Sequence, residues 1–169
     1  MPKSPLQFRL NGRDAALFVD DGQNLLDALR TGAGDLTPKY GCGQGTCGTC
    51  TVLIDGAPRL SCLTLAETAE GANIETVDGL AGAQPHALQQ AFLDHFAAQC
   101  GYCTCGLLMA AKALLDGNPR PTRDDVVEAI SGNICRCTGY EPIIAAILDA
   151  ASRLRGEAPA IPAPVSGAA

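Results

Sequence analysis

The first 80 residues contain short apolar runs that are separated by turn residues. Apolar and polar positions alternate in 6–12, and the Asn-Gly pair that ends this run is typical of a hairpin turn leading into 15–22. An Asp-Gly pair within 51–62 indicates a second hairpin, and 73–80 has the pattern of one more strand. The pattern therefore predicts a small sheet in which hairpins supply most of the strands.

One short helix, over 24–30, interrupts this series of strands. Asn24 is a suitable N-cap for it. The leucines that share one face of this helix are Leu25, Leu26 and Leu29. Strands with a single helix and no repeating β-α-β order are typical of an α+β arrangement. We therefore expect a small mixed α+β domain over 1–80.

After a short linker at 81–84, the apolar period changes to that of helices. The predicted helices are 86–99, 106–117, a helix that begins at a capping box of Thr122 and Asp125, and 141–155. The stripe of the first helix consists of Leu88, Ala91, Phe92 and Phe96. We expect a four-helix bundle over 81–155. The Pro/Ala-rich segment 156–169 is expected to be a disordered or partner-bound tail.

Composition and charge exclude two classes of protein. The chain has 169 residues, 47% of them apolar, and a net charge of −6 with few, scattered Lys and Arg, so we expect no nucleic-acid partner. No apolar stretch is long enough for a membrane span. The N-terminus, MPKSPLQFRL, lacks a long apolar region and a twin Arg, so we expect a cytoplasmic protein. In that compartment, cysteines indicate metal binding or catalysis before disulfides.

The chain has nine cysteines, and a first set of four has the spacing C-x4-C-x2-C-x11-C. These are Cys42, Cys47, Cys50 and Cys62. The first gaps match those of plant-type [2Fe-2S] ferredoxins. Glycines interleave with the thiols at Gly41, Gly43, Gly45 and Gly48, as a loop that wraps a cluster with positive φ angles and close backbone approach would require. The alternative is a structural zinc site, which usually has two C-x2-4-C knuckles instead.

A second set consists of Cys100, Cys103, Cys135 and Cys137, in the pattern C-x2-C…C-x-C. Each pair lies at a boundary between predicted helices, so the ends of a bundle can bring the four thiols together. The C-x-C pair is cramped for a zinc knuckle, and the spacing differs from that of bacterial [4Fe-4S] sites. Rieske ligation needs two histidines. The chain has two histidines, His86 and His95, and we expect both to be helix-surface residues rather than ligands.

Three segments together resemble the iron–sulfur subunit of the molybdenum hydroxylases, the xanthine oxidase family. They are GCGQGTCGTCTVLIDG (41–56), QCGYCT (99–104) and GNICRCTGY (132–140). The resemblance extends over about residues 5–152. It implies an α+β fold, with an N-terminal plant-ferredoxin-like β-grasp domain followed by a C-terminal four-helix bundle. Each of the two domains would hold one [2Fe-2S] cluster.

The resemblance also implies roles for the two cysteine sets. The first set would hold the cluster nearer a flavin, and the second would hold the cluster nearer molybdenum. Gln99 and Cys137 would approach the molybdopterin (as the cytosine dinucleotide) of a large partner subunit. A medium FAD-binding subunit, or another acceptor, would collect the electrons, which makes the complex a heterotrimer. The chain itself shows no catalytic dyad and no nucleotide-binding fingerprint, so we expect it to transfer electrons within an oxidoreductase.

Cys105 is the one departure from the family pattern. Relatives have C-G-x-C-T-P-G, and this chain has Cys105 in place of the proline. We interpret Cys105 as a small buried apolar residue, with a substitute ligand or redox-active thiol as the alternative. Two other functions stay open from the residues alone, a zinc-stabilised adaptor and a free-standing ferredoxin-like carrier.

Overall fold

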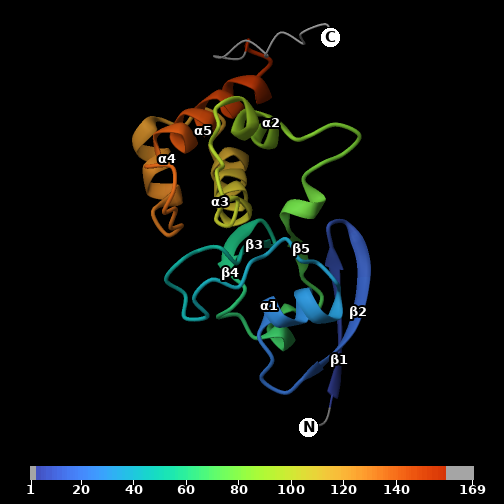
Figure 1. Cartoon of the computed structure of the whole chain (residues 1–169). Coiled ribbons are helices and arrows are strands. Elements are labelled where there is room, and N and C mark those ends of the chain that lie inside the picture. Colours follow the sequence, from blue (N-terminus) through green and yellow to red (C-terminus); the bar gives the residue numbers. More distant parts are fainter. Residues whose placement is uncertain (1–2, 159–169) are drawn as a thin grey trace, which may run out of the picture.

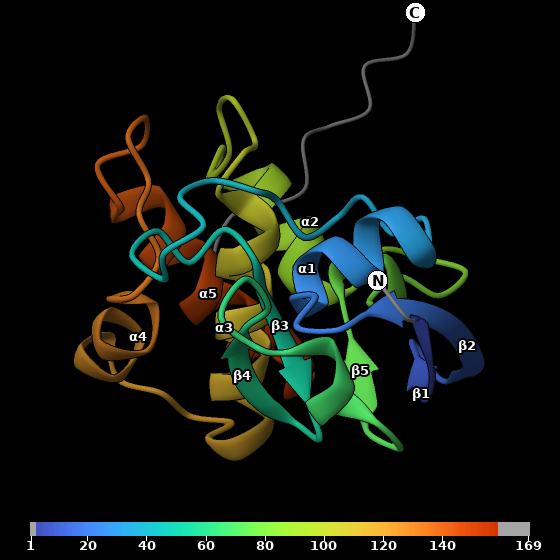
Figure 2. The ribbon, with the colours of Figure 1, turned by 90° about the horizontal axis from the view of Figure 1, so that it is seen from below.

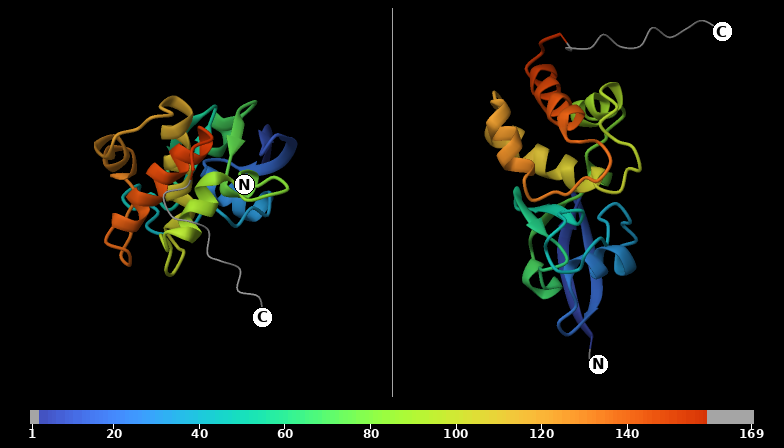
Figure 3. Two further views of the ribbon diagram at one scale, coloured as in Figure 1. Left: turned by 90° about the horizontal axis from the view of Figure 1, so that it is seen from above. Right: turned by 60° about the vertical axis from the view of Figure 1, so that its left-hand side comes forward.

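The computed structural model describes residues 3–158, so most of the predicted tail, 159–169, lies outside the described residues. The helical half sits on one end of a sheet-containing half (Figure 1). The right-hand view of Figure 3 shows the same two layers from the side. Helix α3 packs against strands β3 and β4 where the halves meet.

The sheet has five strands in the order β2-β1-β5-β3-β4. The strands are β1 (Lys3–Leu10), β2 (Arg13–Asp20), β3 (Thr51–Ile54), β4 (Ala57–Leu60) and β5 (Asn73–Glu75). Strands β1 and β5 are parallel, and the other neighbours are antiparallel. Both predicted hairpins are confirmed. At each turn, Asn11-Gly12 and Asp55-Gly56, both residues have positive φ, as a tight two-residue hairpin turn requires.

The predicted short helix is present as α1 (Leu25–Asp27), which continues into the π-helical segment η1 (Ala28–Gly32). The Asn24 side chain accepts a 2.8 Å hydrogen bond from the backbone N–H of Asp27 and so caps the helix as predicted. The three predicted leucines are completely buried, and Leu25 and Leu29 share one core with the residues of the sheet. In the view from below, α1 lies to one side of the strands, completing a β-grasp arrangement (Figure 2).

The predicted strand 73–80 is too long, because β5 ends at Glu75 and a 3-10 turn, η3 (Val77–Gly79), follows. Thr76 between them is fully buried. Its N–H donates to the Asn11 side chain at 2.8 Å, and its hydroxyl donates to Asp35 at 2.6 Å. These side-chain partners replace the neighbouring strand that Thr76 would need to continue the sheet. A second 3-10 turn, η2 (Ala66–Ala69), precedes β5.

The helical half contains the four main helices that were predicted. They are α2 (Ala87–Asp94), α3 (Thr104–Gly117), α4 (Arg123–Ile130) and α5 (Glu141–Leu154). Their apolar faces form one core. The capping box is confirmed, since Thr122 accepts from the N–H of Asp125 at 3.2 Å and Asp125 accepts from the N–H of Thr122 at 2.7 Å.

The predicted helix 86–99 is wrong at its C-terminal end, because α2 stops at Asp94. Phe96 has a left-handed backbone (φ 52°) and is 82% exposed, so it does not belong to the buried stripe. The N–H of Ala97 donates to Phe92 O, and the N–H of Phe96 donates to Leu93 O. This is a Schellman termination with a phenylalanine where glycine is usual.

Candidate metal centres

The loop 41–50 wraps around the side chain of its first cysteine. The Cys42 sulfur accepts hydrogen bonds from the backbone N–H groups of Gln44 (3.5 Å) and Thr46 (3.3 Å). The three loop glycines with predicted cluster-binding roles, Gly43, Gly45 and Gly48, have φ angles of 67°, 81° and 69°. These left-handed residues turn the N–H groups inward, where N–H dipoles stabilise negative charge on sulfur.

The first set of thiols is arranged as two interacting pairs, Cys42 with Cys47 and Cys50 with Cys62. Hydrogen bonds from Thr46 and from the N–H of Gln44 lower the pKa of Cys42 to about 6. Burial and the neighbouring Cys50 raise the pKa of Cys62 to about 11. The two shifts have different causes, since hydrogen bonds that favour the thiolate dominate at Cys42 and burial that disfavours it dominates at Cys62.

Two connections between helices, α2–α3 and α4–α5, bring the second set together. Cys100 follows α2, Cys103 is the N-cap residue of α3, Cys135 follows α4 and Cys137 precedes α5. The Cys100 and Cys137 sulfurs are 3.6 Å apart and belong to exposed residues. Cys103 and Cys135 form the second, buried pair, and burial together with Cys135 raises the pKa of Cys103 to about 12.

Each set therefore offers two pairs of thiols. Among residues 3–158, no three His, Cys, Asp or Glu side chains are grouped as a single metal ion would need. Two irons bridged by sulfide require two thiolates each, which is what the two pairs of a set provide. The residues present thus fit a [2Fe-2S] cluster in each half.

Two further residues that the sequence analysis singled out, Gln99 and Cys105, lie outside these pairs. Gln99 is exposed and adjacent to Cys100, on the open side of the second set. Cys105 lies in the first turn of α3, where burial raises its pKa and the charges of Lys39 and Asp35 act on it in opposite directions. Its half-buried position agrees with the small-apolar interpretation.

The histidines were predicted on the helix surface, and for His95 this is wrong. The His95 side chain is 8% exposed, and its Nε2 lies 2.9 Å from Asp149 Oδ2 of α5. Because Asp149 is 54 residues away in the chain, the sequence pattern could not show this pairing. His86 caps α2, with its Nδ1 accepting from the N–H of Leu88 at 3.2 Å.

Sequence reasoning also missed two residues that orient the second set. The Thr138 hydroxyl lies 3.1 Å from the Cys135 sulfur, and the Tyr140 hydroxyl accepts the Cys135 N–H at 2.9 Å. Both belong to the GNICRCTGY segment, where the available signal was a polar residue three positions after a predicted ligand.

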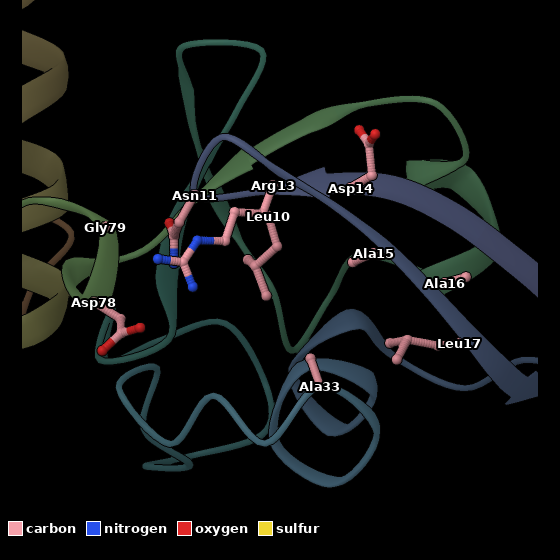
Figure 4. Close-up of a pocket in the computed structure, with 10 residues that line it drawn as sticks. All are labelled: Leu10, Asn11, Arg13, Asp14, Ala15, Ala16, Leu17, Ala33, Asp78 and Gly79. Atoms are coloured by element: carbon pink, nitrogen blue, oxygen red, sulfur yellow. The ribbon is translucent and has the colours of Figure 1, made fainter.

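One cavity of about 350 Å³ lies between the β1–β2 turn and the segments η1 and η3. Arg13 and Asp78 are on the same side of it and Asp14 is directed away (Figure 4). Within the described part of the chain, its lining includes none of the predicted ligands.

Comparisons with known proteins identify a [2Fe-2S] domain in each half of the chain. The family described as "2Fe-2S iron-sulfur cluster binding domain" matches residues 8–81, and the family described as "[2Fe-2S] binding domain" matches residues 76–148. The small subunit of nicotine 6-hydroxylase from Paenarthrobacter nicotinovorans is 47% identical over 88% of this chain and 90% of that protein. The chain belongs to the small iron–sulfur subunits of the molybdenum hydroxylase family.

Further relatives place this iron–sulfur subunit in the same family. The small FeS subunit of nicotinate dehydrogenase from Eubacterium barkeri is 45% identical over 90% of this chain and 98% of that subunit. In the crystal structure of quinoline 2-oxidoreductase from Pseudomonas putida 86, a chain aligns with a TM-score of 0.88 and 50% identity, covering 94% of this chain and all of that one. The iron–sulfur subunit is thus an electron-transfer component of oxidoreductase complexes. None of the helices within residues 3–158 could span a membrane.

Proposed function

We propose that Cys42, Cys47, Cys50 and Cys62 hold one [2Fe-2S] cluster and that Cys100, Cys103, Cys135 and Cys137 hold a second. The observation that carries this proposal is that the thiols of each set come together in pairs, with the sulfurs of Cys100 and Cys137 only 3.6 Å apart. When bound, each cluster accepts one electron and gives it up again. The domains proposed to hold them are 1–80 and 81–155, and the family matches at 8–81 and 76–148 support that division.

The chain's own residues would tune the two sites differently. At the first site, the N–H groups of Gln44 and Thr46 and the Thr46 side chain favour negative charge on Cys42. At the second site, the buried pair Cys103 and Cys135 lies in the apolar core of the bundle. The low polarity of this core makes added negative charge less favourable at the second site. The hydrogen bonds that reach Cys135 act in the opposite direction.

The partners we propose are a large molybdopterin-binding subunit and a medium FAD-binding subunit or another electron acceptor. The exposed pair of Cys100 and Cys137, with Gln99 beside it, supports a contact between this edge and the molybdopterin of the large subunit. Several relatives are themselves named as subunits of larger enzymes. We also propose a cytoplasmic location, because thiols stay reduced in that compartment and so remain available as cluster ligands.

Native purification of the chain from its source tests this function. We expect a coloured complex that contains a large subunit with stoichiometric molybdenum, and flavin where the medium subunit is present. Iron and acid-labile sulfide should be equimolar. A colourless chain with stoichiometric zinc would support the adaptor function instead. A coloured monomer that never associates with a molybdenum protein would support a free-standing carrier.

A further inference from the structure

Asn133 connects the helical half to the first cysteine loop. It lies in the GNICRCTGY segment, where the function described so far gives it no role, and it is 5% exposed. Its side-chain Nδ2 donates to the Gly48 carbonyl oxygen at 2.8 Å and to the Thr51 hydroxyl at 3.3 Å. These acceptors are more than 80 residues earlier in the chain. A buried amide with such partners holds the two halves at a fixed separation.

The residue after Asn133 makes a second connection, and this one joins the two sets of predicted ligands. The backbone N–H of Ile134 donates a 2.9 Å hydrogen bond to the carbonyl oxygen of Cys47. Cys47 belongs to the first set, and Ile134 directly precedes Cys135 of the second. Covalent bonds and this one hydrogen bond therefore form a continuous route from one ligand set to the other.

Glycines at this contact bring the backbones to close range. A Cβ at Gly48 would overlap the Gly132 carbonyl and come within 2.6 Å of the Asn133 amide nitrogen. A Cβ at Gly106, in the first turn of α3, would overlap the Gly48 carbonyl. The contact is therefore a tight junction of three segments with little freedom to slide.

Tyr140 supports the same junction from the start of α5. Its hydroxyl donates to the Asn133 carbonyl oxygen at 3.3 Å and accepts the Cys135 N–H at 2.9 Å. The orientation of Asn133 is thus linked to the orientation of a predicted ligand. We call the group of Gly48, Asn133, Ile134 and Tyr140 the inter-site junction.

We propose that Asn133 is a positioning residue that fixes the Cys47–Ile134 hydrogen bond and, through it, the electronic coupling between the two cysteine sets. The inference rests on the proposed function, since it requires a cluster in each set. In the coupled step, one electron leaves the second site, which is oxidised, and enters the first, which is reduced; no proton moves and no bond breaks. A route through bonds and one short hydrogen bond couples the sites better than the same distance through space.

The test compares the intact complex containing wild-type chain with the variant Asn133→Asp. The variant keeps the shape of the side chain and all eight ligands, but it places a carboxylate oxygen where the amide donated to Gly48. We expect unchanged iron and sulfide content, a smaller magnetic interaction between the two reduced sites in electron paramagnetic resonance, and about 10-fold slower internal electron equilibration after rapid partial reduction.

Two further variants complete the design. Thr51→Val removes the hydroxyl that accepts from Asn133 and should change both measurements in the same direction by less. Asn118→Ala, which alters an amide between α3 and α4 that bonds Asp125, should leave both unchanged. Wild-type magnetic interaction and rates in Asn133→Asp and Thr51→Val would overturn the proposal, and so would loss of iron, which would indicate a role in site assembly. A wild-type complex that lacks both cluster signals would instead contradict the proposed function.

Discussion

The sulfurs of Cys100 and Cys137 lie 3.6 Å apart, although 37 residues separate them in the chain. They form the exposed pair of the second set, and we expect them to share one iron. Replacement in Cys137→Ala removes one of its two thiolates, so the purified chain should lose about half of its iron while the first site keeps its visible absorption. Iron analysis and absorption spectroscopy measure this.

The matched control is Cys105→Ala, which removes the ninth thiol and leaves all eight proposed ligands in place. It should retain the iron content of the wild-type chain. If Cys105→Ala also lost half of the iron, Cys105 would be a ligand and the assignment of the second set would have to change.

Gly48→Ala should be much more destabilising than another glycine replacement in the same half. The position has φ 69°, and the added Cβ would overlap the Gly132 carbonyl, so we expect a loss of about 3 kcal/mol in unfolding free energy. Gly56→Ala, in the β3–β4 turn with φ 78° and nothing within 4 Å, should lose only about 1 kcal/mol. Chemical denaturation of both variants gives the comparison, and equal losses would argue against a tight junction at Gly48.

The guanidinium of Arg153 neutralises two buried carboxylates in the bundle. It lies 2.7 Å from Asp94 and 2.6 Å from Asp149, whose side chains are 6% and 0% exposed. Arg153→Met should destabilise the chain by about 3 kcal/mol, because both acids lose a partner in a buried setting. The exposed pair of Arg123 and Glu141 provides the control, since Arg123→Met should cost less than about 1 kcal/mol. Urea titrations that gave equal costs would contradict this difference.

The same network predicts a dependence of stability on pH. The hydrogen bond from Arg153, followed by that from Gln90, lowers the pKa of Asp94 below its ordinary value. A carboxyl whose pKa is lowered in the folded state stabilises the fold above its unfolded pKa and loses this contribution as the pH falls. The stability difference between wild-type chain and Asp94→Asn should therefore be constant near neutrality and shrink below about pH 4. A difference that stayed constant through that range would show that Asp94 gains nothing from its partners when charged.

Local patterns were sufficient for much of the fold. Asn24 and Thr122 cap their helices as predicted, and the Asn-Gly and Asp-Gly turns form both hairpins, because each signal acts within a few residues. Phe96 shows where such patterns fail. Its spacing fits the helical stripe, but the backbone bonds of the next residue end the helix, and no glycine marks the position.

The site was predictable only in part for a related reason. Cysteine spacing and the family resemblance supply the candidate ligands, and polar groups such as Thr138 lie near them in the sequence. Other contacts join segments that are distant in the sequence. His95 pairs with Asp149, and Asn133 with Gly48, across 54 and 85 residues. Such pairings are decided by how the helices pack on the sheet, and a single sequence does not display that packing.

The two thiol sets also differ in how much of the chain must fold before their four thiols are brought together. Residues 42–50 hold three thiols of the first set in one loop, so only Cys62 has to arrive from outside it. The second set is assembled from the α2–α3 and α4–α5 connections, so it requires that the helices pack together into the bundle. The visible absorption of the proposed second cluster should therefore report whether the whole bundle is folded. The absorption of the proposed first cluster should report chiefly whether one loop is folded.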